Sequence, residues 1–113
     1  MFEAFKPQIS KVDVPGLDHP VYLREMTARE AWAVEIEAGN KVYPQFVLAI
    51  IACLCNEKGH RVYVFEPRAD GMTFDKATAD EICGWPSRAV NVIIGAIAEL
   101  GDDDQEAEAT EKN

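Results

Sequence analysis

The sequence predicts an α+β domain that is predominantly helical, with an N-terminal β-hairpin followed by about four helices around a central apolar helix. Three observations predict this fold class. Strand-forming residues flank a loop rich in proline and glycine near the start of the chain. An apolar run without a polar position occupies residues 46–55. Apolar residues with the spacing of one helical face follow between residues 90 and 100.

Length and composition indicate one folded domain over residues 1–101 and a disordered acidic tail over residues 102–113. The chain has 113 residues, of which 48% are hydrophobic, enough for a single core. The tail holds six of the 20 acidic residues, one of the 11 basic residues and no large apolar side chain. The net charge of −9 disfavours nucleic acid and anionic membranes as partners.

Residues 9–26 have the pattern of a β-hairpin. Valine-rich and isoleucine-containing runs lie on both sides of the loop Pro15-Gly16-Leu17-Asp18-His19-Pro20, whose residue types favour turns. Pro15 and Pro20 lack an N–H for a β-ladder, so we expect strand pairing to stop at them.

A helix is expected to begin at Thr27, because Thr27-Ala28-Arg29-Glu30 has the capping-box pattern, and to end at Gly39-Asn40. Trp32 and Ile36 are expected on its inner side, and Val34 is a further candidate. Its glutamates are expected to face solvent, which would make it an outer helix: Glu30, Glu35 and Glu37.

The apolar run 46–55 predicts the central helix, with Pro44 suited to its first turn. The turn 56–60, a short strand or extended segment at 61–65 and a loop at 67–71 are expected to follow.

Two helices are predicted near the C-terminal end. Thr73 or Asp75 can cap the first, which runs to Ile82, and Ser87 is expected to cap the second, which runs to Leu100. Beside the core face of the second lies a strip of small residues, which either widens the core stripe or forms a subunit contact: Ala89, Val92 and Ala96.

The sequence contains no pattern typical of a catalytic, cofactor-binding or metal site, and we expect no enzyme activity and no cofactor. Its glycines are scattered, its five arginines show no cluster, and its two histidines stand far apart at 19 and 60. Cys53, Cys55 and Cys83 occur in apolar or helical contexts, so we expect buried, reduced thiols.

The N-terminal residues lack the pattern of a signal peptide, and the longest apolar stretch is shorter than the roughly 20 residues that cross a bilayer. These features predict a cytoplasmic location.

The order of these elements resembles the tail assembly chaperones of long-tailed bacteriophages and prophages. Two stretches carry the resemblance: the segment 12–30, with its valine-rich strand, Pro/Gly turn and Thr-Ala-x-Glu helix start, and the segment 50–63, in which an apolar helix ends in an acidic-Gly turn. A closing amphipathic helix and an acidic tail extend the likeness over nearly the whole chain.

The resemblance implies a non-enzymatic chaperone of virion morphogenesis, with a predominantly helical fold and a small β element. Such a protein binds and solubilises the tape measure protein, helps to recruit tail tube subunits, and is absent from the mature virion. It would work in the host cytoplasm and assemble along its partner as open oligomers. Phe2 and Phe5, ahead of the first strand, can either contact a neighbouring copy or cover the domain's own core.

In many members of this family a ribosomal frameshift near the end of the gene adds a domain, and the longer form would engage the tube protein. The chain ends Glu111-Lys112-Asn113, which codons containing the slippery heptamer A AAA AAC can encode. The acidic tail is then either a solubilising segment or a linker into a longer product.

Two other classes compete with the chaperone hypothesis. An acidic DNA mimic or inhibitor would use the negative charge, but without its tail the chain keeps 14 acidic and 10 basic residues, a net charge of only −4. A small thiol-dependent enzyme would need an exposed cysteine of lowered pKa.

Overall fold

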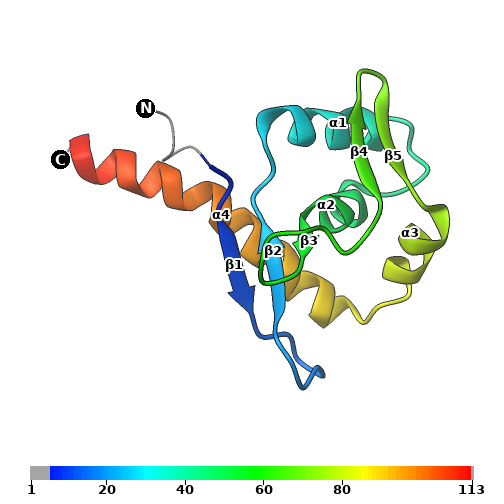
Figure 1. Ribbon diagram of the computed structural model, residues 1–113, viewed down its shortest axis with the longest axis horizontal. Coiled ribbons are helices and arrows are strands. Elements are labelled where there is room, and N and C mark those ends of the chain that lie inside the picture. Colours follow the sequence, from blue (N-terminus) through cyan, green and yellow to red (C-terminus); the bar gives the residue numbers. More distant parts are fainter. Residues whose placement is uncertain (1–5, 113) are drawn as a thin grey trace.

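The computed structural model describes residues 6–112, with the side chains of residues 6–101, and it is a compact α+β domain (Figure 1). Helices make up more of it than strands, as the sequence predicts. The described residues form these elements: β1 (Ile9–Val12), β2 (Val21–Arg24), α1 (Ala28–Ala38), α2 (Gln45–Cys53), β3 (Leu54–Cys55), β4 (Phe65–Arg68), β5 (Gly71–Phe74), α3 (Lys76–Cys83) and α4 (Ser87–Lys112).

The first sheet is antiparallel, with strand order β1-β2-β3. β1 and β2 pair across the predicted proline-bracketed loop, from Ile9 opposite Arg24 to Val12 opposite Val21. The third strand is a correction, because the helix expected over residues 46–55 ends at Cys53. Leu54 and Cys55 pair with β2 instead. An apolar run does not reveal where a helix stops, since a buried strand and a buried helix share the same composition.

α1 begins as the capping box predicts. The Glu30 N–H donates to the Thr27 hydroxyl while the Glu30 carboxylate accepts from the Thr27 N–H, and the helix ends at Gly39. Its predicted inner face is wrong in one respect. Trp32 is 65% exposed, because Glu30, Ala33 and Val34 form the buried face and position 32 lies off it.

α2 is buried over most of its length, from Val47 to Cys53, while Phe46 at its first turn stays half-exposed. Helices α1, α3 and α4 all contact it. Figure 1 shows α1 above α2 and α3 beside it, with the β4–β5 hairpin against α1.

The hairpin of β4 and β5 corrects one expectation, because the loop expected at 67–71 is mostly strand. In the segment 61–65, expected as a short strand or an extended segment, Arg61 forms an isolated bridge with Cys55 and β4 begins at Phe65. The turn lies between Arg68 and Gly71, which pair across it. Gly71 has a φ of 149°, a conformation that glycine adopts at no steric cost. Pro67 is tolerated inside β4 because the hydrogen-bonding groups at its position face the outer edge of the sheet, where a missing N–H breaks no ladder bond.

The C-terminal helices follow the prediction except at their ends. Asp75 stands at the N-cap of α3 but makes no side-chain cap bond. Ser87 is the first residue of α4 and not its cap, since the Pro86 carbonyl accepts the first helical bonds, from Ala89 and Val90. The helix extends to Lys112, beyond the expected end at Leu100.

The burial of α2 gives the first testable prediction. Ile50→Ala should lower the free energy of unfolding by about 2–5 kcal/mol, because Ile50 is fully buried and its removal leaves a cavity. Val64→Ala is the matched control, since Val64 is 53% exposed and should change stability by less than about 0.5 kcal/mol. Chemical denaturation measures both, and equal effects would contradict the packing described.

Candidate functional site

An apolar hollow of about 460 Å³ lies between the loop of the first hairpin and the start of α4. We call it the Trp85 groove. Eleven residues line it: Val14, Pro15, Gly16, Leu17, Val21, Leu54, Trp85, Pro86, Arg88, Ala89 and Ile93.

Two turns shape the walls of the Trp85 groove. On the hairpin side, the Leu17 N–H donates to the Val14 carbonyl at 3.1 Å, and Gly16 supplies the positive φ of 94° that this turn uses. Leu17 is 47% exposed there. On the helical side, the Trp85 N–H donates to the Ile82 carbonyl, which ends α3 and leaves the indole half-buried at the junction with α4.

Trp85 also borders a second hollow, of about 210 Å³, between the start of α2, the end of α3 and the start of α4. Phe46, 40% exposed, and Val90 contribute to its lining. The indole therefore stands between two apolar hollows.

The lining of the Trp85 groove suits binding and not acid–base chemistry. Among the described residues, Arg88 is the only charged one that lines it, and no histidine, cysteine or carboxylate of residues 6–101 does so. A concave apolar surface with one cation at its border can take up apolar side chains of a partner and an acidic group beside them.

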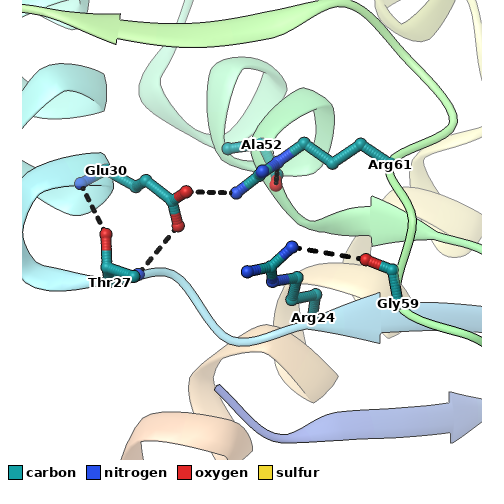
Figure 2. A network of polar contacts seen from close by, with 6 residues as sticks. All are labelled: Arg24, Thr27, Glu30, Ala52, Gly59 and Arg61. Carbon is teal, nitrogen blue, oxygen red and sulfur yellow. Dashed lines mark hydrogen bonds and ion pairs between the residues drawn. The ribbon is translucent and has the colours of Figure 1, made fainter. Parts of the chain in front are cut away.

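A polar network on another part of the domain joins three segments (Figure 2). Glu30 is only 8% exposed and forms an ion pair with Arg61, which corrects its expected place on a solvated helix face. The Nε of Arg61 donates to the Ala52 carbonyl at 2.8 Å, and its guanidinium lies 4.8 Å from the ring centre of Phe65. The contacts of this network join segments of the fold to one another, so we assign the network no ligand.

Two of the three cysteines are buried as the sequence predicts, but Cys83 is exposed at the end of α3. Burial raises the pKa of the Cys53 thiol to about 12. Burial also raises the pKa of Cys55, against an opposing effect of Arg24 and Arg61. Neither buried cysteine has the lowered pKa of a nucleophile.

The structure describes three of the five residues that the sequence singles out for partner binding, and it places them in two different grooves. Ala89 is buried and lines the Trp85 groove, whereas Val92 and Ala96 line a different groove beside β1. Phe2 and Phe5 lie outside the described residues. Trp85 and Leu17 were not among the predicted binding residues. Their sequence signals are an aromatic residue next to a proline at a helix junction and an apolar residue at a loop tip.

Among the described side chains, those of residues 6–101, no cluster of three or more histidine, cysteine or acidic residues could hold a metal ion. No helix within residues 6–112 combines the length and the apolar character needed to cross a membrane. Comparison with protein-family models, with curated proteins and with solved structures gives no match to this chain.

The exposure of the cysteines gives the second testable prediction. Titration of the native protein with an aromatic disulfide reagent at neutral pH should show one fast-reacting thiol, because only Cys83 is accessible, and two more after denaturation. Cys83→Ser should abolish the fast phase. A fast phase that persists in this variant would mean that Cys53 or Cys55 is reactive, and it would favour the thiol-enzyme hypothesis.

Proposed function

We propose that this chain is a tail assembly chaperone of a long-tailed phage or prophage, and that the Trp85 groove binds an apolar helical segment of the tape measure protein. The groove is the observation that carries the proposal. A chaperone that keeps a long, partly apolar helical protein in solution needs an exposed apolar concavity, and an amphipathic helix can lay its apolar face into such a groove.

The lining residues give the proposed contact its chemistry. Leu17 and Trp85 offer apolar surface on opposite walls, and Arg88 offers a cation to an acidic residue at the border of the incoming helix. The domain has a net charge of −4 without its tail, whereas the one charged residue among those that line the groove is the cation Arg88.

The order of the elements agrees with the resemblance on which this proposal draws. A hairpin leads through a capping box into α1, a buried apolar helix follows, and an amphipathic helix closes the chain. We further propose that α2 is the central helix around which the other elements pack, so that the groove is set on a rigid core. The protein acts in the host cytoplasm, forms open oligomers along the tape measure protein and leaves before the virion matures.

The binding experiment uses the full chain in a Trp32→Phe background, where Trp85 is the only tryptophan. Titration with synthetic apolar helical segments of the cognate tape measure protein should shift the Trp85 emission to shorter wavelength, because the indole leaves water. Leu17→Glu should weaken binding at least about tenfold, which corresponds to about 1.4 kcal/mol. Val64→Glu is the control, an equally exposed apolar residue that does not line the groove.

The outcomes separate the function from the site. Binding that Leu17→Glu and Val64→Glu affect equally would remove the groove from the proposal and leave the chaperone role. A chain that neither binds any tape measure segment nor keeps the coexpressed tape measure protein soluble would overturn the chaperone role itself.

A further prediction concerns the longer protein that a ribosomal frameshift would produce. If Glu111-Lys112-Asn113 lies on a slip site, the gene should contain A AAA AAC or a close variant there, followed by a −1 open reading frame of domain length. Mass spectrometry should find a minor longer protein, and synonymous recoding of the heptamer should abolish it. A linker of this kind would raise the local concentration of the added domain to about the millimolar range. Codons that cannot slip would exclude the longer form and leave the shorter chaperone unaffected.

A further inference from the structure

Within the described residues, the outer edges of β3, β4 and β5 are protected. Pro67 presents no N–H on the outer edge of β4. On β5, the Met72 N–H donates to the Glu37 carboxylate at 3.0 Å. On β3, the Leu54 carbonyl accepts from the Val62 N–H at 3.0 Å. This leaves the outer edge of β1 as the one sheet edge of residues 6–112 without such cover.

The hydrogen-bond pattern shows which groups this edge presents. The Glu25 N–H donates to the Gln8 carbonyl at 2.8 Å, so position 8 faces β2. Because the direction alternates along an antiparallel ladder, the N–H and C=O groups of Ile9 and Lys11 face away from β2. Asp13 directly follows Val12, the last residue of β1, and would present its groups in the same direction if a partner extended the strand by one residue. All three side chains are exposed.

A groove of about 350 Å³ runs between this edge and α4. Val92, Gly95 and Ala96 form part of its helical wall. Gly95 lies inside α4, where glycine weakens a helix relative to alanine, yet no atom lies within 4 Å of the position that a Cβ would take. Nothing within the described chain requires a glycine there, whereas a second backbone that approaches α4 closely would.

We propose that β1 pairs antiparallel with β1 of a second copy of this chain, about a two-fold axis at Val12. In this register Lys11 of each copy lies opposite Asp13 of the other, and the two Val12 residues lie opposite each other. The three-stranded sheets of the two copies join into one six-stranded sheet.

Charge complementarity identifies the second copy as the occupant. A lysine on an edge strand usually discourages pairing, but here an aspartate follows two residues later, on the same side of the strand. Antiparallel self-pairing about Val12 therefore forms two opposite-charge pairs across the strands. Pairing about Lys11 would instead place two lysines opposite each other, and this disfavours a register shifted by one residue per strand.

The parity of the ladder supports the same register. The backbone groups of Lys11 face outward, and those of Asp13 would do so once the strand is extended by one residue, so that pairing across the axis forms hydrogen bonds from both residues. The two Val12 residues then form a non-hydrogen-bonded pair, in which the Cα atoms approach to about 4.5 Å. Val12 lines the groove with Val92 and Ala96, so these two residues of α4 lie on the face where the two copies meet.

This inference does not rest on the proposed function. A two-fold contact of this kind closes after two copies, whereas assembly along a tape measure protein needs a further, open contact. A dimer that binds no tape measure segment would overturn the chaperone role and keep this interface. A monomer that binds such a segment would overturn this interface and keep the chaperone role.

The decisive experiment introduces one cysteine at a time into β1 of the full chain, in a Cys83→Ser background. This background removes the exposed native thiol. Val12→Cys should form an intermolecular disulfide under mild oxidation, because a non-hydrogen-bonded antiparallel pair has the Cα separation that a disulfide needs. Ser10→Cys is the matched control, two residues away on the same side of β1, where this register places Val14 of the second copy opposite. Rapid cross-linking of Ser10→Cys without that of Val12→Cys would overturn the register, and the absence of both would overturn the interface.

Sedimentation of charge-reversal variants, in chains without added cysteines, tests the same interface through the dimer dissociation constant. Lys11→Asp should raise the dimer dissociation constant at least about tenfold, and adding Asp13→Lys should restore it, because the exchanged charges are again complementary. Gly95→Lys should raise the thermal midpoint of the monomer and yet weaken the dimer. A chain that sediments as a monomer at several hundred micromolar, or a double variant that fails to recover while remaining folded, would overturn the proposal.

Discussion

Both oxygens of the Glu30 carboxylate are engaged, and through them three distant segments meet (Figure 2). One oxygen accepts from the Thr27 N–H and starts α1, while the other accepts from Arg61, whose Nε donates to the Ala52 carbonyl. Ala52 lies in the last turn of α2, where carbonyls have no partner within the helix. A single buried carboxylate thus holds the beginning of one helix against the end of another. Loss of either partner would leave a charge with little access to solvent, which costs about 3 kcal/mol.

The position of this ion pair explains why the apolar helix can end where it does. The Leu54 N–H donates to the Ile50 carbonyl and Arg61 takes the Ala52 carbonyl, so the chain can leave the helix inside the core without losing these bonds. It then enters the sheet as β3. This sharp change of direction brings Leu54 against the hairpin loop, where it lines the Trp85 groove. The proposed binding surface therefore depends on a polar contact that lies outside it.

Local signals were sufficient to predict some elements from the sequence. The capping box at Thr27, the proline-bracketed hairpin and the Gly39 helix end all depend on neighbouring residues, and all are observed. Contacts between distant residues were not predictable in this way. The partner of Glu30 is 31 positions away, so the sequence alone gave no reason to bury it. The β4–β5 hairpin was missed because Pro67 argues against a strand until its position on an outer edge is known. The Trp85 groove likewise forms only when residues of the first hairpin and of α4 come together.

The two proposed surfaces have a geometric consequence when they are taken together. Val14 and Leu17, which line the Trp85 groove, follow the C-terminal end of β1. Antiparallel pairing of two β1 strands places these ends on opposite sides of the two-fold axis, so a dimer would present two grooves that are separated along the joined strands. A long partner that fills one groove would then hold its next apolar segment near the other, which raises the effective concentration for the second contact. A weak single site could in this way retain an extended helical protein, provided that the spacing of its apolar segments matches the separation of the grooves.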